Sequence, residues 1–361
     1  MKRAGVAAAI ASAAMLTATV LPAQAATTPG WRQVESHHYG PAADYSGYTT
    51  ALALSSSNAW AFGGSDLSSG GGTLQVPVAV HWNGRTWSGS NLPSTVTSSI
   101  EAASAPAAND IWAVTFNGGY VLHYNGSSWS VAKRLPATGG GGLLLDTTDV
   151  VAFSATNVWV FGGSGFGPGE GTWHYNGSAW TLVTSAGEDG DLSLASATSA
   201  SSIWALGGSG APAADSLVHY NGKTWASAYS SALNGYQLDR IAALPGKTTD
   251  LWVSANTTGN AYKSYLLHYG DHWSGVLVPW GLGIGSSVAS DGHGGLWFSA
   301  RAASGSNWMV HWLPGNKWQR VEVPYLGGPT LIPGTSALLA GGSLNDSPAG
   351  ASAVVWGYGS I

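Results

Sequence analysis

The chain has 361 residues, of which 52 are Gly and 19 are Trp, while charged residues make up only 9%. Few helix-forming residues, many glycines and many aromatics predict an all-β protein. There is no Cys, which excludes disulfides, thiolate metal sites and a cysteine nucleophile. The formal net charge of −5 argues against nucleic acid as a partner.

The amino terminus has the pattern of a secretory leader. A basic start, Met-Lys-Arg, precedes an apolar run from about Ala4 to Leu21 and a small-residue end at Ala25. This predicts a signal peptide over residues 1–25, cleaved after Ala25, and a secreted, extracellular protein of residues 26–361. Cleavage would remove Lys2 and Arg3 and lower the net charge from −5 to −7. A membrane anchor is the alternative, but the run is rich in Ala and ends in a cleavage site. No later apolar run is long enough to span a bilayer, so we expect no membrane insertion.

A Trp-His-Trp unit returns six times along the chain with a mean spacing of about 47 residues between first Trp residues. Its positions are Trp60, His81 and Trp87; Trp112, His123 and Trp129; Trp159, His174 and Trp180; Trp204, His219 and Trp225; Trp252, His268 and Trp273; Trp297, His311 and Trp318. Each unit reads as four short strands, for example 100–103, 110–114, 120–124 and 128–131. Four antiparallel strands per repeat predict a β-propeller blade, with a β-solenoid as the alternative.

The two ends of the chain predict a seventh blade. Residues 330–332, 337–340 and 353–356 read as three strands without a fourth, and residues 31–34 read as a strand without partners. Pairing them would close the ring and remove both sheet edges. We therefore expect a single seven-bladed β-propeller over residues 26–361, its last blade built from three C-terminal strands and one N-terminal strand.

The hairpin of each unit is clearest at 122–129, Leu-His-Tyr-Asn-Gly-Ser-Ser-Trp. Asn-Gly predicts a two-residue type I′ turn, because both residues tolerate positive φ. Ligands on different blades could not converge on one metal ion. The six repeated His are therefore expected to pack beside the Trp residues and bond to backbone, and the repeated Trp to fill the space between blades.

The repeat resembles the kelch motif, in which an apolar run ends in a double Gly and a Tyr and a Trp follow. The matching segments are Trp-Ala-Phe-Gly-Gly at 60–64, Trp-Val-Phe-Gly-Gly at 159–163 and Trp-Ala-Leu-Gly-Gly at 204–208. The double Gly is absent from the second, fifth and sixth units. The resemblance implies the seven-bladed centre of the galactose oxidase family. It does not imply copper-radical chemistry, which needs a Tyr cross-linked to Cys.

A single segment, Asp291-Gly292-His293-Gly294-Gly295-Leu296-Trp297-Phe298, looks like the repeat of sensor-type propellers and of the streptogramin B lyase family. No serine-hydrolase elbow, zinc-protease motif or phosphate-binding loop occurs.

Function in propellers usually lies on loops, where repetition breaks. The loops that lead into the innermost strands should share one face around the central channel. Acidic residues gather on it, with one Arg beside them: Glu101, Asp146, Asp149, Glu188, Asp189, Asp191, Asp239 and Arg240. They could bind Ca²⁺ or a cationic group, or hold an acid/base pair; a solvated rim is the other interpretation.

His37 and His38 belong to the same face and depart from the repeat, which makes them candidates for ligand binding or acid/base chemistry; plain surface is the alternative. Two aromatic residues outside the repeat, Trp280 and Tyr325, are candidates for sugar binding, because an aromatic ring can stack on the apolar face of a sugar. Burial between loops would explain such aromatics equally well.

These observations favour a secreted, non-catalytic binding module without a cofactor. Its expected partner is a polysaccharide or cell-envelope polymer, or else an extracellular protein, and we expect a monomer. The alternative is an extracellular hydrolase or lyase with an acidic site at the channel mouth.

Overall fold

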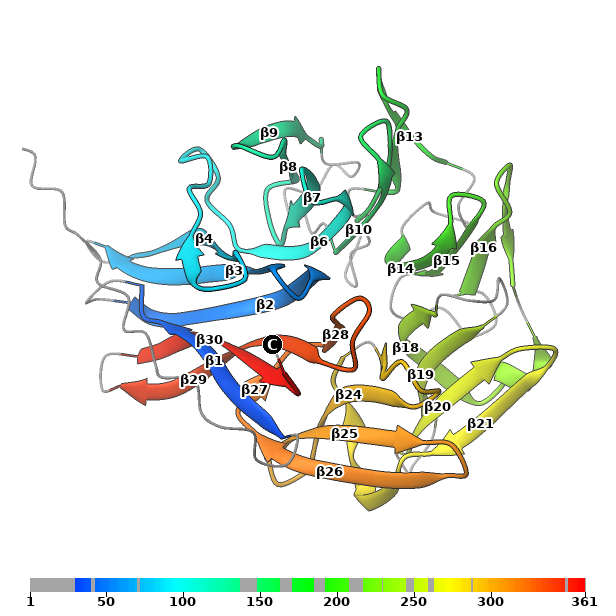
Figure 1. The fold of residues 1–361 in the computed structure, drawn as a ribbon. Coiled ribbons are helices and arrows are strands. Elements are labelled where there is room, and N and C mark those ends of the chain that lie inside the picture. Colours follow the sequence, from blue (N-terminus) through cyan, green and yellow to red (C-terminus); the bar gives the residue numbers. More distant parts are fainter. Residues whose placement is uncertain are drawn as a thin grey trace, which may run out of the picture.

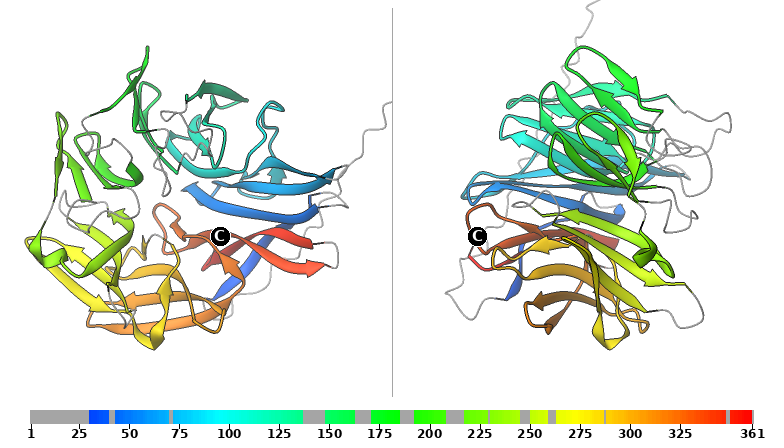
Figure 2. Two further views of the ribbon diagram at one scale, coloured as in Figure 1. Left: turned by 180° about the vertical axis from the view of Figure 1, so that it is seen from behind. Right: turned by 90° about the vertical axis from the view of Figure 1, so that its right-hand side faces the viewer.

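The computed structural model describes residues 30–39, 43–69, 72–136, 148–162, 171–184, 192–207, 217–228, 230–244, 250–258, 263–286, 288–347 and 350–360. Seven antiparallel sheets stand around a central axis (Figures 1 and 2). The first strands of neighbouring sheets lie against one another near that axis, and the chain then proceeds outward through each sheet. The protein is thus a seven-bladed β-propeller, as predicted.

The first four blades have the order of the chain. Blade 1 is β2 (Ala43–Ser55), β3 (Asn58–Ser69), β4 (Gly72–Trp82) and β5 (Trp87–Gly89); blade 2 is β6 (Ile100–Ala107), β7 (Asp110–Thr115), β8 (Tyr120–Tyr124) and β9 (Trp129–Arg134). Blade 3 is β10 (Asp149–Ser154), β11 (Asn157–Phe161), β12 (Trp173–Tyr175) and β13 (Trp180–Leu182); blade 4 is β14 (Leu192–Ser199), β15 (Ser202–Gly207), β16 (Leu217–Tyr220) and β17 (Trp225–Ser227). The strands expected in blade 2 agree with these bounds to within a few residues.

Blade 5 is β18 (Tyr236–Ala243), β19 (Leu251–Thr257), β20 (Ser264–Tyr269) and β21 (Trp273–Leu277). Blade 6 has a split inner strand, β22 (Gly283–Ile284) and β23 (Ala289–Ser290), followed by β24 (Leu296–Arg301), β25 (Asn307–Leu313) and β26 (Lys317–Val323). Two 3₁₀ turns, η1 (Ser231–Leu233) and η2 (Pro279–Gly281), precede these two blades. No helix in the described part of the chain is long and apolar enough to cross a membrane.

Blade 7 contains strands from both ends of the chain. Its strands are β27 (Tyr325–Leu326), β28 (Thr330–Leu331), β29 (Leu338–Ser347), β30 (Gly350–Tyr358) and β1 (Trp31–His37). β1 pairs antiparallel with β30, from Trp31 opposite Tyr358 to His37 opposite Ala353, so the blue and red ends of the ribbon lie side by side (Figure 1). A register shift between Gln33 and Glu35 marks a bulge in β1.

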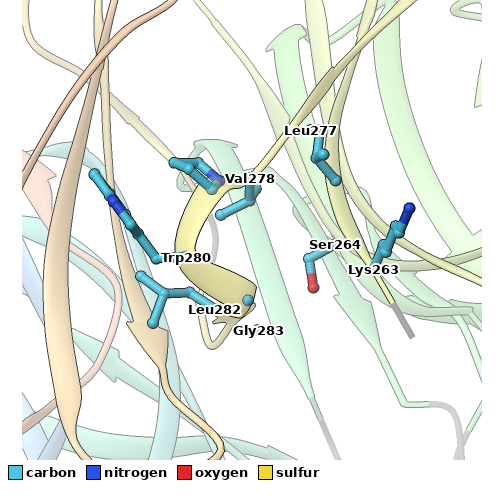
Figure 3. Close-up of a pocket in the computed structure, with 9 residues that line it drawn as sticks. Lys263, Ser264, Leu277, Val278, Trp280, Leu282 and Gly283 are labelled. Carbon is cyan, nitrogen blue, oxygen red and sulfur yellow. The ribbon is translucent and has the colours of Figure 1, made fainter. Parts of the chain in front are cut away.

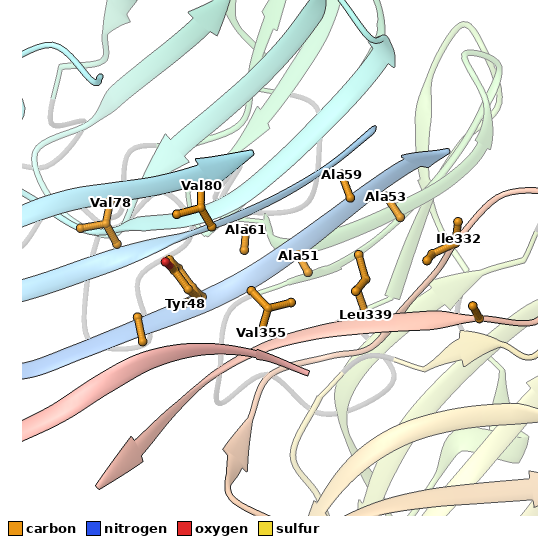
Figure 4. Close-up of a cluster of buried hydrophobic side chains, with 12 residues drawn as sticks. Tyr48, Ala51, Ala53, Ala59, Ala61, Val78, Val80, Ile332, Leu339 and Val355 are labelled. Atoms are coloured by element: carbon orange, nitrogen blue, oxygen red, sulfur yellow. The ribbon is translucent and has the colours of Figure 1, made fainter. Parts of the chain in front are cut away.

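Each apolar core cluster lies between two neighbouring blades. The cluster between blades 7 and 1 joins Tyr48, Ala51 and Val80 to Leu339 and Val355 (Figure 4). Six further clusters repeat this arrangement around the described ring. First Trp residues of the repeat are buried in them, Trp60 being only 2% exposed, so the prediction that these Trp fill the space between blades is confirmed.

Hydrogen bonds also connect the inner strands of neighbouring blades, although these strands do not pair with one another as a sheet. Ser104 Oγ accepts from the N–H of Ala152 at 3.0 Å, and Ser196 Oγ accepts from that of Ala243 at 2.8 Å. Thr49 Oγ1 donates to the carbonyl of Ile100 at 2.6 Å. Small polar side chains on the first strands therefore link one blade to the next.

The hairpin turn differs from the type I′ turn predicted for Asn-Gly. Tyr124 pairs with Trp129, which leaves a four-residue loop. Gly126 has positive φ (93°) and Asn125 is not among the described residues with positive φ. Asn125 instead accepts hydrogen bonds on Oδ1 from the N–H groups of Ser127 and Ser128, both at 3.0 Å, as an Asx turn does.

Candidate functional site

Each blade alternates strand direction, so the segments that lead into the first strands all open on one face of the ring. We call this the entry face. The described candidates from the sequence lie along it, and their contacts differ from one to the next. Asp146, Glu188, Asp189 and Asp191 lie outside the described residues.

Asp149 opens β10 and is partly buried, and both of its carboxylate oxygens bond to backbone amides. Its Oδ1 accepts from the N–H of Val150 at 2.8 Å, and its Oδ2 accepts from that of Ala195, on β14 of the next blade, at 2.9 Å. Burial raises the pKa of Asp149 to about 7 against these hydrogen bonds, and the charge of Glu101 adds to the increase. Asp149 therefore links blades 3 and 4, with Glu101 close enough to influence its protonation.

Asp239 and Arg240 pair with each other. The Arg240 guanidinium donates from Nη1 to Asp239 Oδ1 at 3.0 Å and also to the Asp239 carbonyl at 3.0 Å. Both side chains are about one-third exposed (37% and 36%). Within the described chain, no group of three or more His, Asp and Glu residues gathers as metal ligands.

His37 and His38 lie at the end of β1, near a partly buried acid and two tyrosines. The His37 ring lies 4.3 Å from that of Tyr39, and burial, with a smaller effect of His38, lowers the pKa of His37. Tyr39 and Tyr48 share a hydroxyl–hydroxyl hydrogen bond of 3.0 Å. Both ring nitrogens of His38 are buried without a hydrogen-bond partner among the described residues.

Glu35 is the member of this cluster that the sequence did not suggest. Burial raises its pKa from 4.5 to about 7, although a hydrogen bond with Tyr48 opposes the change. Its position follows the bulge in β1, and bulges re-aim side chains. The bulge is a tertiary feature, so no motif in the sequence indicated this acid.

Trp280 is the most distinctive residue of the entry face. It lies in η2 between blades 5 and 6, is 47% exposed, and has a left-handed backbone with φ of 63°. Such a conformation is strained for a bulky residue, by about 1–2 kcal/mol. Strain of this kind collects at functional sites, where the fold maintains it.

A cation stacks against this Trp. The Arg320 guanidinium, from β26, lies 4.5 Å from the ring of Trp280 and 4.2 Å from the ring of Trp308 on β25. The cation–π contacts fix one side of the Trp280 indole, and its exposure leaves room for another group to stack. Arg320 was not among the residues predicted from the sequence, because its outer-strand position carries no motif.

A pocket of about 230 Å³ lies at the same turn. Its lining is Lys263, Ser264, Leu277, Val278, Pro279, Trp280, Gly281, Leu282 and Gly283. In Figure 3 the Trp280 side chain lies on the side of η2 that faces blade 6, while Lys263 and Ser264 lie on the other side, on blade 5. The site thus combines apolar walls, an ammonium, a hydroxyl and an aromatic ring at the rim. Tyr325, the other aromatic candidate, opens β27 and is 57% exposed.

The six repeated His are structural and do not form a site. Each ring stacks on the first Trp of its own blade, with centroids 4.1–4.3 Å apart. Each Nε2 contacts a side chain: Asn58, Asp110, Asn157, Ser202, Asp250 or Asp291. The expected packing on Trp is confirmed, but the expected backbone partner is wrong. In five of the blades, the side chain two residues before the first Trp bonds to the Nε2 atom instead.

No protein-family model matches the sequence, and no curated protein matches it. Solved structures do resemble the fold. YCF48 bound to a D1 peptide aligns with a TM-score of 0.57 and 14% identity, over 93% of this chain and 98% of that one. A catalytically inactive virginiamycin B lyase from Staphylococcus aureus with quinupristin aligns with a TM-score of 0.58 and 7% identity, over 90% and 99%.

A puromycin-hydrolyzing peptidase of Mycobacterium tuberculosis aligns with a TM-score of 0.56 and 12% identity, over 90% of this chain but 53% of that one. At such identities the likeness concerns the fold and not the ligand or the reaction. The sheet topology and the solved structures agree that the chain is a seven-bladed β-propeller.

Proposed function

We propose that this protein is a secreted, non-catalytic binding module that holds an extracellular polysaccharide on its entry face, at the Trp280 site. The observation that carries the proposal is the exposed, strained Trp280 stacked on Arg320 beside a pocket. We also propose that the repeat is of the kelch type and that the signal peptide is cleaved after Ala25.

The chemistry of the site supports a sugar. An indole face can stack on the apolar face of a pyranose. Lys263 can donate to sugar hydroxyl groups, and Ser264, whose own proton goes to Asn256 Oδ1 at 2.7 Å, can accept a hydrogen bond from one. The pocket is smaller than the roughly 300–1,000 Å³ that encloses a drug-sized ligand, which suits one ring of a longer chain. The cations Lys263 and Arg320 favour a polymer with carboxylate groups or many hydroxyls.

Binding of a soluble acidic polysaccharide such as polygalacturonate, measured by isothermal titration with neutral glucans in parallel, tests this function. Trp280→Ala should weaken binding at least about tenfold, since aromatic anchors dominate binding energies. Trp280→Gly, which relieves the left-handed strain, should lose binding while its free energy of unfolding stays within about 1 kcal/mol of the natural protein. Phe116→Ala, at another exposed aromatic (39%), is the matched control.

Unchanged affinity in both Trp280 variants would refute the site. Capture of a peptide or protein instead of any polysaccharide would favour the other expected partner, an extracellular protein. Mass spectrometry of the exported protein tests the leader, because cleavage after Ala25 leaves Ala26 as the first residue.

An extracellular hydrolase or lyase at the channel mouth is the second candidate. One observation favours it: Asp149, with a pKa of about 7 beside Glu101, could exchange a proton near neutral pH. Both Asp149 oxygens are already bonded to backbone, however, so the carboxyl would have to leave those partners to reach a substrate. Release of reducing ends or unsaturated sugars by the natural protein, abolished by Glu101→Gln, would establish this alternative.

A further inference from the structure

The outer hairpin of blade 5 is one residue shorter than those of blades 2, 3 and 4. Four residues separate Tyr from Trp in blades 2, 3 and 4, as in Tyr220–Trp225. In blade 5 only Gly270, Asp271 and His272 lie between Tyr269 and Trp273, which still pair across the hairpin. The shorter loop lacks the Asn whose side chain accepts from the turn backbone in blades 1 to 4.

This difference changes the contact between blades. The hairpin Trp of blades 2, 3 and 4 packs against the first Trp of the preceding blade, with ring centroids 5.8 Å (Trp60–Trp129), 6.1 Å (Trp112–Trp180) and 5.7 Å (Trp159–Trp225) apart. Trp204 contacts Tyr269 at 5.8 Å, but the described ring contacts include none between Trp204 and Trp273. Trp273 still packs against the apolar cluster that contains Trp204, but the described contacts do not include the direct ring contact found at three other junctions.

A pocket of about 470 Å³ opens at this junction of blades 4 and 5. It is lined by Trp204, Ala228, Ser230, Ala232, Tyr269, Asp271, His272 and Trp273. Its volume lies within the range of about 300–1,000 Å³ that is typical of ligand sites. Asp271 and His272 replace the turn sequence of the repeat, so the residues that break the pattern are also the polar residues at the pocket.

We propose that this pocket is a second carbohydrate site, which takes a neutral sugar ring. Tyr269 and Trp273, whose rings lie 5.1 Å apart, offer partly exposed aromatic walls for the apolar face of the ring. The carboxylate of Asp271 accepts hydrogen bonds from sugar hydroxyls, and the imidazole of His272 donates or accepts one. Ser230 Oγ accepts from the N–H of Ala232 at 3.3 Å and keeps its own proton to donate.

The two sites lie at opposite ends of one outer strand. β21 begins at Trp273 in this pocket and ends at Leu277 in the Trp280 pocket, and five residues of strand span roughly 16 Å. A polysaccharide along the outside of blade 5 can therefore contact both sites at once. The ligand class rests on the proposed function of the Trp280 site, whereas the pocket rests on the short hairpin alone.

The test closes the pocket by lengthening its hairpin, which also removes Asp271 and His272 and leaves the aromatic walls in place. Residues 270–272 are replaced by Asn-Gly-Ser-Ser, the turn of residues 125–128, which should bring Trp273 over Trp204 as in blades 2 to 4. Ala179→Ser, which gives the blade 3 turn the same four residues, is the matched control. Asp271→Asn with His272→Ala removes the polar groups and leaves the hairpin length unchanged.

The probes are hexamers of β-1,4-glucose, β-1,3-glucose and N-acetylglucosamine and the corresponding soluble polymers, observed by NMR of the His272 imidazole and by titration calorimetry. We expect at least one hexamer to shift the His272 signals of the natural protein and of Trp280→Ala. The grafted turn should abolish hexamer binding at this pocket in the Trp280→Ala background. The affinity for the soluble polymer should fall at least about tenfold in Trp280→Ala alone and in the grafted turn alone, because each change removes one of the two sites and bivalent binding is lost.

The outcomes separate the two proposals. If no hexamer shifts the His272 signals of the natural protein, the second site is overturned, whatever Trp280→Ala does. If the signals shift in the natural protein and the grafted turn abolishes hexamer binding measured by calorimetry while Trp280→Ala changes nothing, the second site stands and the Trp280 site fails. Equal hexamer binding by the grafted turn and by Ala179→Ser would also overturn the inference.

Discussion

Glu35 illustrates how a single residue responds to its place in the ring. Its carboxyl lies against Tyr48, and Oε2 is buried without a partner among the described residues. Burial disfavours the charged form, which raises the pKa of Glu35 to about 7. Glu35 therefore stays protonated in the folded protein at pH values at which the unfolded chain has already released the proton.

Glu35→Gln should make stability less dependent on pH. Because the folded pKa of Glu35 is raised, its contribution is complete below pH 4.5 and is lost as the pH rises to about 7. At about 1.36 kcal/mol per pKa unit, the free energy of unfolding of the variant relative to the natural protein should rise by up to about 3 kcal/mol between pH 4.5 and 8.5. Guanidinium unfolding at both pH values measures this, with exposed Glu322→Gln as the control. A constant difference would contradict the prediction.

The repeated His residues differ in the charge of their partners. His81, His174 and His219 contact Asn58, Asn157 and Ser202, and burial lowers the pKa of all three imidazoles. Folding keeps them neutral, so the stability they contribute is complete above about pH 6.5 and is lost as the pH falls below that value. In blades 2, 5 and 6 a carboxylate occupies the partner position instead.

Asn58→Asp should convert the first blade to the charged arrangement. An anion about 3.0 Å from Nε2 favours the imidazolium, so the pKa of His81 should rise by about one unit or more. Titration of the His81 ring by NMR measures the change. Asn157→Asp should act in the same way on His174, and an unchanged pKa in both variants would show that the contact is too weak to matter.

At the scale of elements, blade 6 reaches the same Trp-His contact by a different route. Gly295 stands two residues before Trp297, where other blades have Asp, Asn or Ser. Asp291, from the end of the split inner strand, supplies the carboxylate to His311 at 2.8 Å. Burial alone would raise the pKa of Asp291, but hydrogen bonds from His311, His293 and Gly295 lower it below the ordinary value.

Gly295→Ala should destabilise blade 6 by about 2–3 kcal/mol. A Cβ at this position would lie 2.3 Å from Asp291 Oδ2 and 2.8 Å from the Trp312 carbonyl, so the carboxylate or the neighbouring strand must move. Gly89→Ala, where nothing lies within 4 Å, is the matched control and should be neutral. Thermal unfolding of both variants decides the point, and equal midpoints would show that Asp291 moves aside without cost.

At the scale of the whole molecule, β1 connects the amino-terminal part of the described chain to its last sheet. Trp31 is only 9% exposed and lies 5.8 Å from the rings of both Trp297 and Tyr358. Without β1, the edge of β30 would lose its hydrogen bonds and the aromatic cluster between blades 6 and 7 would open.

A protein that begins at residue 43 should be less stable by at least about 3 kcal/mol, the cost of truncating a buried Trp alone. A synthetic peptide of residues 30–39 should restore the melting temperature by adding a strand to the open edge. The same peptide with Trp31→Ala is the control and should restore little. Equal rescue by both peptides would mean that the Trp31 contacts do not hold the closing strand.

The blades and their number follow from local patterns. Alternating residues, Gly turns and the Trp-His-Trp spacing are properties of short segments, and the same four-stranded unit satisfies them in every repeat. The hairpin was placed correctly at Tyr124–Trp129, but its turn type was not. The Asn125 side chain bonds to the backbone of Ser127 and Ser128, and this replaces the expected positive φ.

By itself, the sequence determined where strands, hairpins and blades lie, because these depend on neighbours along the chain. Only the tertiary structure decided what the unrepeated residues meet. Asp149 bonds to Ala195 of the next blade, Arg320 stacks on Trp280 of the preceding loop, and Glu35 packs against Tyr48 across the closure. These partners lie far apart along the chain, in different blades or in the turn between two blades. Their contacts therefore depend on the packing of sheets, which no spacing along the chain encodes.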